Sequence, residues 1–401
     1  MKIGILGYGT VGSGLIEIID NNKMRNIEIS NILIRNIEKY EGAKYYDKIT
    51  TNIDDIFEKD IEILVELMGG LHPSYEYIKK ALNKKIHVVT ANKDLIAEYG
   101  DELIEIANKN NVSMKFEASV GGGIPVLKSL IESLEGNKID NIKAILNGTT
   151  NFILSKMHDE NLSYEEALKQ AQHLGFAEAN PESDVMGYDA ARKLSILSTI
   201  AYNNRVYWKD IYLEGITDID EKDIDYAKRI NCKIKLLGQS DNSENDINAY
   251  VRPVLVSNDN ILSQINNEYN VVIVNGDSVG EVSFIGKGAG KLATGSAVYS
   301  DILDILDSRS KKINSFSSEK IKVNQIIKNK CSALVRFSSY KKKEILEIIK
   351  ACSESYNILE EKEELVILID ANSEHEINNS ICAIRDFGYC QNARKIIKLQ
   401  W

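Results

Sequence analysis

The glycine-rich segment GYGTVG, residues 7–12, constrains the fold more than any other part of the chain. It directly follows the apolar run KIGIL and opens a helical pattern, the context in which a G-x-G-x-x-G segment binds a dinucleotide. Gly7 permits a tight turn, Gly9 lets backbone approach a pyrophosphate, and Gly12 allows the helix to pack closely. The helix N-terminus then offers N–H groups to the phosphates. We therefore expect a dinucleotide-binding unit at the start of the chain.

Strand-like and helix-like segments alternate through the first third of the sequence. Strands that alternate with helices predict a parallel sheet with right-handed crossovers. We therefore expect a doubly wound, Rossmann-type domain over residues 1–135. Its predicted strands after the first are 27–35, 61–68, 86–91 and 112–119, and its predicted helices are 10–23, 73–85 and 93–111.

The middle of the chain follows a different pattern. Helices and then strand-like runs, such as 249–256 and 270–276, predict an α+β domain over residues 136–310. The segment NGTTN, residues 147–151, is interpreted as a turn after a strand. A helix over about 291–309 is expected to return to the N-terminal domain.

The last part of the chain predicts a third, smaller unit over residues 321–401, after a polar linker near 308–320. Its elements follow the order β-α-β-α-β, with room for one more strand around 356–361. This order is typical of a small ferredoxin-like βαββαβ module. The fold class we expect is thus α/β, with a Rossmann-type domain, an α+β domain and a regulatory module.

Composition excludes several classes of partner. The formal net charge of -10 argues against nucleic acid or an anionic membrane as the main partner. No run approaches the roughly 18 uninterrupted apolar residues of a membrane span, and the N-terminus has no apolar segment of signal-peptide length. The five cysteines form no C-x-x-C, and the five histidines have no zinc-ligand spacing. We expect an enzyme of the reducing cytoplasm without a zinc site.

The helical segment GYDAARKLSILSTIA, residues 187–201, places a charged pair beside an apolar face. At about 100° per residue, Asp189 and Lys193 fall on the side of the helix that should face the core. They are either an ordinary ion pair one turn apart or groups held inside for chemistry. The preceding loop adds Glu178, Glu182 and Asp184, whose carboxylates could hold a substrate ammonium group and pair a desolvated lysine.

Other residues of interest follow the predicted strands. Arg35 follows the second strand, where an arginine suits the 2′-phosphate of NADP, so NADP is favoured over NAD. Lys93 lies at the carboxyl edge of a buried strand, where open α/β sheets bind ligands. The segment KGAGK, residues 287–291, is not a phosphate-binding P-loop because Leu292 follows Lys291, and we interpret it as a glycine-rich loop near the cofactor.

The longer motifs together resemble a known family. The succession GYGTVGSG, VELMGG, VVTANKDLIA, FEASVGGGIPVL, LNGTTNFIL, LGFAEANPESDVMGYDAARKLSIL and GKGAG resembles homoserine dehydrogenase over about residues 1–310. The resemblance implies NAD(P)-dependent interconversion of L-homoserine and L-aspartate 4-semialdehyde, on the route to threonine, methionine and isoleucine. It also implies a homodimer, or a higher homo-oligomer, formed through the middle domain.

The resemblance assigns roles to individual residues. Lys193 would be the proton donor and acceptor, and Lys93 a second lysine at cofactor and substrate. Glu178 and Asp189 would bind substrate, with Asp184 nearby. The cofactor would contact Gly7, Tyr8, Gly9, Thr10, Val11, Gly12, Arg35, Lys93, Gly175 and Gly288. A sodium ion would be held by Glu117, Val120, Gly122 and Ile124, largely through backbone carbonyl groups.

Two departures from the family pattern stand out. Asn180 replaces the usual aspartate of the substrate loop, which puts substrate affinity in doubt. The C-terminal unit resembles an amino-acid-binding ACT module in element order only, since it lacks the turn built on Asp, Pro and Gly, and this puts threonine feedback in doubt. Two alternatives stay open: a related dehydrogenase that acts on another amino-acid semialdehyde, and a non-catalytic nucleotide-binding amino-acid sensor.

Overall fold

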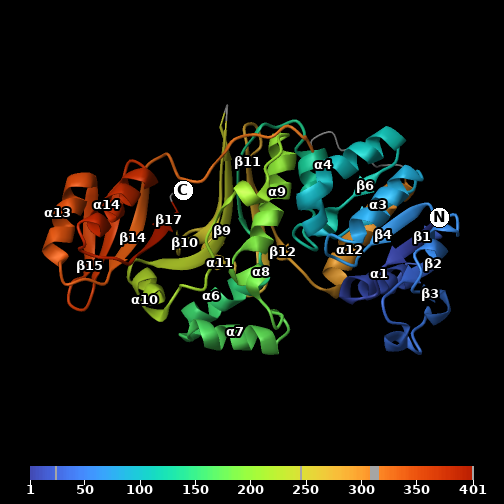
Figure 1. Ribbon diagram of the computed structural model, residues 1–401, viewed down its shortest axis with the longest axis horizontal. Coiled ribbons are helices and arrows are strands. Elements are labelled where there is room, and N and C mark those ends of the chain that lie inside the picture. Colours follow the sequence, from blue (N-terminus) through green and yellow to red (C-terminus); the bar gives the residue numbers. More distant parts are fainter. Residues whose placement is uncertain (23–24, 244–245, 308–315, 400–401) are drawn as a thin grey trace.

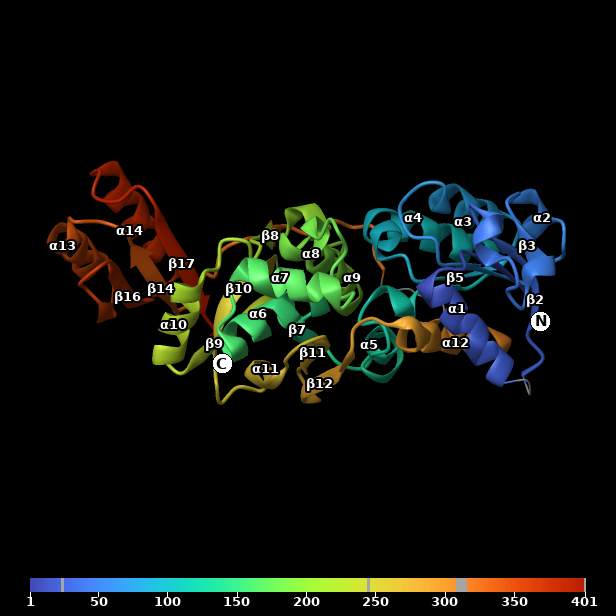
Figure 2. The same cartoon turned by 90° about the horizontal axis from the view of Figure 1, so that it is seen from below.

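The computed structural model describes residues 1–22, 25–243, 246–307 and 316–399. The chain forms three lobes in a row, with the N-terminal lobe in blue, the middle lobe in green and yellow, and the C-terminal lobe in red (Figure 1). The middle lobe separates the other two, and the view from below shows the same order (Figure 2). Across the described ranges, no helix is long and apolar enough to cross a membrane.

The N-terminal lobe contains the predicted doubly wound sheet. Its strand order is β3-β2-β1-β4-β5-β6 with all pairs parallel, which is the order of a Rossmann fold. The strands are β1 (Lys2–Leu6), β2 (Glu28–Leu33), β3 (Ile49–Thr50), β4 (Ile63–Glu66), β5 (His87–Thr90) and β6 (Met114–Lys115). The helices of this part are α1 (Thr10–Asn21), α2 (Asp54–Phe57), α3 (Ser74–Asn83) and α4 (Lys93–Asn110).

The last strand of this sheet is shorter than its apolar sequence predicts. Only Met114–Lys115 pair in the sheet, and Glu117–Ser119 form a 3-10 turn. The N–H of Glu117 donates to the carboxylate of Asp301, at 2.9 Å, instead of to a neighbouring strand. This contact ties the end of the sheet to a helix that comes much later in the sequence.

Helix α12 (Lys291–Leu306) returns to the N-terminal lobe as expected. It lies beside α1, as Figure 2 shows, and glycine makes the approach possible. A Cβ atom at Gly14 would lie 2.1 Å from the carbonyl oxygen of Lys291, and one at Gly295 would lie 2.9 Å from the backbone N of Leu15. The first turn of α12 is therefore held against the helix that follows the glycine-rich motif.

The middle lobe is an antiparallel sheet covered by helices on one face. Its strands lie in the order β12-β11-β7-β9-β10. They are β7 (Ile139–Ile145), β9 (Cys232–Asn242), β10 (Ile247–Ser257), β11 (Tyr269–Gly276) and β12 (Gly280–Lys287), with β8 (Tyr212–Leu213) beside β10. The helices are α5 (Val126–Lys128), α6 (Gly148–Glu160), α7 (Tyr164–His173), α8 (Glu182–Val185), α9 (Tyr188–Tyr202), α10 (Glu221–Arg229) and α11 (Ile261–Gln264).

Two local expectations in the middle lobe have different outcomes. The interpretation of NGTTN as a turn is wrong, because α6 begins at Gly148. The side chain of Asn147 caps that helix by accepting the N–H of Thr150, at 2.9 Å, so the polar segment starts a helix. The spacing of Ser163 and Glu166 predicts a capping box at the start of α7, and the structure confirms it.

The C-terminal lobe has the predicted element order, including the additional strand, β15. Its strands lie in the order β17-β14-β16-β15. The elements are β14 (Cys331–Phe337), α13 (Lys342–Cys352), β15 (Ser355–Glu360), β16 (Leu365–Ala371), α14 (Glu374–Asp386) and β17 (Ala393–Lys398). Strand β17 also pairs in parallel with β10, which joins the two sheets into one of eleven strands among the described residues.

The predicted polar linker lies partly outside the described residues, which resume at 316. Phe316 is buried against Gly100 of α4, and the N–H of Arg205 donates to the carbonyl of Glu319. Strand β13 (Val323–Asn324) then pairs with β10. From Phe316 onward the segment is thus packed along the middle lobe before it enters the C-terminal sheet.

Candidate active site

The glycine-rich motif opens onto a cavity of about 490 Å³ at the carboxyl ends of β1 and β2. A Cβ at Gly7 would lie 2.7 Å from the carbonyl oxygen of Leu67, and a Cβ at Gly12 would lie 2.3 Å from that of Gly7. Around Gly9, by contrast, nothing lies within 4 Å of the Cβ position. The open space at Gly9, next to the N-terminus of α1, fits a pyrophosphate, as the spacing predicts.

The far end of the same cavity carries positive charge. Arg35 and Lys39 are exposed residues that line it, and Asn36 between them caps a short 3-10 helix. The rings of Tyr8 and Tyr40 stack at 5.1 Å between centroids. Arg35 therefore lies where its sequence position predicts, and Lys39 adds a second cation. Sequence reasoning missed Lys39 because no motif marks the short 3-10 helix that contains it.

A cluster of two lysines and an aspartate lies where the N-terminal and middle lobes meet. The Nζ atom of Lys193 lies 2.7 Å from Oδ2 of Asp189 and donates to the carbonyl oxygen of Leu146 at 2.9 Å. The Nζ atom of Lys93, at the start of α4, lies 3.2 Å from Oδ1 of Asp189. Only 12% of the Lys193 side chain and 6% of the Asp189 side chain are exposed. The prediction that this pair faces inward is confirmed.

The opposite charges of this cluster stabilise the ionised forms of Asp189 and Lys93. Burial opposes ionisation of Asp189, but the ammonium groups of Lys193 and Lys93 outweigh it and hold the pKa of Asp189 well below its usual range. The same carboxylate raises the pKa of Lys93 against the effect of burial. Asp189 is therefore ionised, and Lys93 protonated, over the neutral pH range.

The acidic segment before α9 is partly helical rather than all loop, because Glu182 and Asp184 lie in α8, and it contributes the carboxylate of Asp184 to the cluster. Asn147 donates from Nδ2 to Asp184, at 2.7 Å, and to Asp189, at 2.8 Å, so it holds the two carboxylates side by side. Burial, and then the charge of Asp189, raise the pKa of Asp184. Sequence reasoning did not single out Asn147. The one sequence signal for Asn147 is its position in NGTTN, between a strand and a helix, where an asparagine side chain can cap the helix.

The other residues of the acidic loop lie at the surface. Glu178 is exposed, and its carbonyl oxygen accepts a hydrogen bond from Gln172. Asn180 accepts the N–H of Glu182 at the start of α8. Gly175 is exposed, with φ of +77°. Among the described contacts, none brings the side chain of Glu178 to the lysines.

The predicted sodium loop lies beside the loop of Gly288. A Cβ at Gly122 would lie 2.5 Å from the carbonyl oxygen of Gly288, so the two segments touch through backbone. The carboxylate of Glu117 accepts the N–H groups of Leu127 and Lys128, at 3.0 and 2.7 Å. Burial raises the pKa of Glu117 to about 7, although those two N–H groups favour its ionised form.

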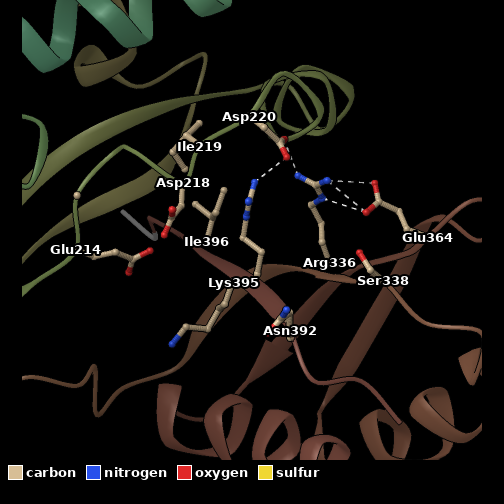
Figure 3. Close-up of a pocket in the computed structure, with 13 residues that line it drawn as sticks. Glu214, Asp218, Ile219, Asp220, Arg336, Ser338, Glu364, Asn392, Lys395 and Ile396 are labelled. Atoms are coloured by element: carbon tan, nitrogen blue, oxygen red, sulfur yellow. Dashed lines mark hydrogen bonds and ion pairs between the residues drawn. The ribbon is translucent and has the colours of Figure 1, made fainter. Parts of the chain in front are cut away.

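A second cavity, of about 400 Å³, lies between the middle and C-terminal lobes (Figure 3). Arg336 spans one wall, where it contacts Asp220 at 2.7 Å and Glu364 at 3.3 Å. Glu214 and Asp218 lie on the opposite wall (Figure 3). None of the residues predicted for catalysis or cofactor binding lines this cavity, so it is separate from the lysine cluster.

The fold and the first cavity define a dinucleotide-binding protein of the Rossmann type. Comparison with known proteins gives the family. Residues 7–117 match the family model described as homoserine dehydrogenase, NAD binding domain, and residues 125–303 match the model described as homoserine dehydrogenase. The chain belongs to the homoserine dehydrogenase family. It is an oxidoreductase that acts on homoserine with a nicotinamide cofactor, in amino-acid biosynthesis.

Individual relatives support this membership. The homoserine dehydrogenase of Bacillus subtilis is 41% identical over 76% of this chain and 73% of its own length, and that of Synechocystis is 45% identical over the same shares. A homoserine dehydrogenase structure from Thiobacillus denitrificans, 33% identical, covers 100% of this chain and 98% of its own with a TM-score of 0.92. A hyperthermophilic archaeal homoserine dehydrogenase in complex with NADPH, 30% identical, covers 78% of this chain and 99% of its own with a TM-score of 0.67.

Proposed function

We propose that Lys193 transfers the proton in the interconversion of L-homoserine and L-aspartate 4-semialdehyde. The observation that carries this proposal is the position of its ammonium group, which is held by Asp189 and by the carbonyl of Leu146. An ammonium group has three N–H donors, and these contacts use two of them. The third is free to meet the substrate oxygen.

The bound nicotinamide supplies or accepts the hydride. In the direction of reduction, the aldehyde oxygen becomes an alkoxide, which needs a proton and positive charge beside it. Lys193 gives up its third N–H proton to that oxygen and becomes neutral. Asp189 would then be a buried anion without Lys193 as its counter-ion. Lys93, which contacts the other oxygen of Asp189, keeps that charge paired throughout the reaction.

The acidic residues of the middle lobe are proposed to bind the substrate. Asp184 and Asp189, held by Asn147, would orient it next to Lys193. Glu178 would bind its ammonium group after a movement of the exposed loop that carries it. Asn180 leaves that loop with one negative charge fewer than an aspartate would give.

We propose NADP as the preferred cofactor over NAD. Arg35, with Lys39 beside it, gives the ribose end of the cavity two cations for the 2′-phosphate. The glycines of residues 7–12 would hold the pyrophosphate, with Tyr8, Thr10 and Val11 lining the turn. Gly175 and Gly288 would contact the nicotinamide half.

We also propose a sodium ion at Glu117, Val120, Gly122 and Ile124. Val120 and Gly122 are buried, and within the described chain no hydrogen-bond donor reaches their carbonyl oxygens. Oxygen ligands of this kind suit a hard cation. Replacing sodium chloride by choline chloride at equal ionic strength should lower the thermal midpoint. Equal midpoints in the two salts would reject the ion.

We propose three domains. Residues 1–135 form the cofactor-binding domain, residues 136–310 form the catalytic domain, and residues 321–401 form an ACT-like regulatory module. The βαββαβ order supports the module. We propose a homodimer through the middle lobe. Light scattering of the purified chain tests the assembly, and initial rates with and without threonine test the regulation.

The decisive experiment on the chemistry is Lys193→Ala. Removal of a positioned acid–base group should lower kcat by about 10³-fold. Binding of NADPH, followed by its fluorescence, should stay within about twofold, a free-energy change of about 0.4 kcal/mol. Near-normal turnover in this variant would rule out Lys193 as the proton carrier.

A further inference from the structure

Asn270 carries a buried side-chain amide that has no partner. The residue is 1% exposed, and in the described chain neither Nδ2 nor Oδ1 makes a hydrogen bond. A buried amide without hydrogen bonds costs about 1–3 kcal/mol. The chain contains a close contrast in Asn151, also 1% exposed, whose Nδ2 donates to three carbonyl groups and whose Oδ1 accepts from Lys235.

The amide of Asn270 lies against the backbone of Gly288. A Cβ at residue 288 would lie 2.0 Å from Nδ2 and 2.8 Å from Oδ1 of Asn270, so glycine at this position makes room for the amide. The loop that contains Gly288 leads directly into α12, whose first residue, Lys291, packs on Gly14 of α1. The loop therefore lies beside the helix that begins at the dinucleotide motif.

Asn270 is also a close neighbour of the strand end that holds Lys193. Strands β11 and β7 pair at Val271 and Ile145, and one residue further along lie Asn270 and Leu146. The carbonyl oxygen of Leu146 accepts a hydrogen bond from the ammonium group of Lys193. Asn270 thus lies between the loop next to the dinucleotide motif and the strand end that holds Lys193.

We propose that Asn270 is a positioning residue for the dinucleotide cofactor. When the dinucleotide occupies the cleft, the 287–290 loop settles onto the amide, and the backbone N–H and C=O groups of this loop satisfy it. The unpaired amide raises the free energy of the empty form, and its pairing favours the bound form. This inference rests on the proposed place of the nicotinamide half between Gly288 and Lys193.

The test compares Asn270→Leu with Asn151→Leu in the full chain. Leucine has nearly the same shape as asparagine but cannot form hydrogen bonds. Asn270→Leu should leave the thermal midpoint of the empty enzyme unchanged or raised, because it removes an unpaired polar group. It should weaken NADPH binding about tenfold through the loss of its bonds to the loop. Asn151→Leu should lower the midpoint and leave the affinity for NADPH unchanged.

The affinity for NADPH decides the outcome. If Asn270→Leu binds NADPH no more weakly than Asn151→Leu, the amide is satisfied in both states, by an ordered water for example, and the proposal is overturned. Asn270→Ala gives the same comparison should the leucine variant not fold. Absence of NADPH binding to the wild-type chain would instead reject the proposed function.

Discussion

The ammonium group of Lys93 lies 3.2 Å from Oδ1 of Asp189, although the two residues belong to different lobes. Lys93 opens a helix of the Rossmann lobe, and Asp189 lies in the first turn of a helix of the middle lobe. The contact joins the two lobes at the point where Lys193 lies. It therefore couples the position of α9 to that of the N-terminal lobe.

Lys93→Met removes the second cation beside Asp189 and leaves Lys193, the proposed proton carrier, in place. Methionine keeps the long apolar side chain but leaves Asp189 without its second cation when Lys193 loses a proton. We expect kcat to fall about 10–100-fold, as for the loss of a charge-assisted contact worth about 1.5–3 kcal/mol. NADPH affinity should change much less. Steady-state rates and NADPH fluorescence measure the two effects, and an unchanged kcat would contradict the role given to Lys93.

Arg35→Ser should change the choice of cofactor. The serine cannot pair with a 2′-phosphate, so KM for NADP should rise about 10–100-fold, while KM for NAD stays nearly constant. Lys39→Ser, in the same cavity, should show a smaller effect of the same sign. Initial rates with both cofactors test this. Equal losses with NADP and NAD would mean that Arg35 does not recognise the phosphate.

Glu374→Gln should loosen the C-terminal lobe. Arg252 of β10 and Glu374 of α14 are 1% and 3% exposed, and their two hydrogen bonds measure 2.7 and 2.9 Å. Burial opposes the ionised carboxyl, but Arg252 prevails and lowers the pKa of Glu374 from 4.5 to about 2. This difference corresponds to about 3 kcal/mol of stability at neutral pH.

The sign of the pH effect follows from this lowered pKa. The stabilisation is fully present above pH 4.5, the ordinary value, and disappears as pH falls towards 2. Urea unfolding should therefore show a deficit of about 3 kcal/mol for Glu374→Gln at pH 7 that shrinks at pH 3. A deficit that is equal at the two pH values would show that the carboxylate charge is not its source.

Local sequence patterns specify the N-terminal lobe and single out the groups that we propose to react. A tight turn followed by a helix N-terminus requires glycine at fixed positions, here Gly7, Gly9 and Gly12. This requirement is local, so it applies wherever the motif follows a strand. The inward side of Lys193 follows from helical periodicity alone. The C-terminal element order was likewise predicted, because each element there carries its own periodic pattern.

How these parts meet depends on packing between segments that are distant in the sequence. The contacts of Lys93 with Asp189, of Asn147 with Asp184, and of Arg252 with Glu374 join segments far apart in the chain. No local pattern encodes such pairs, since each depends on how sheets and helices pack. The joining of β17 to β10 was unpredictable for the same reason, because an edge strand can pair with any neighbour that packing brings to it. Periodicity thus determines which face of an element is buried, and packing determines what that face contacts.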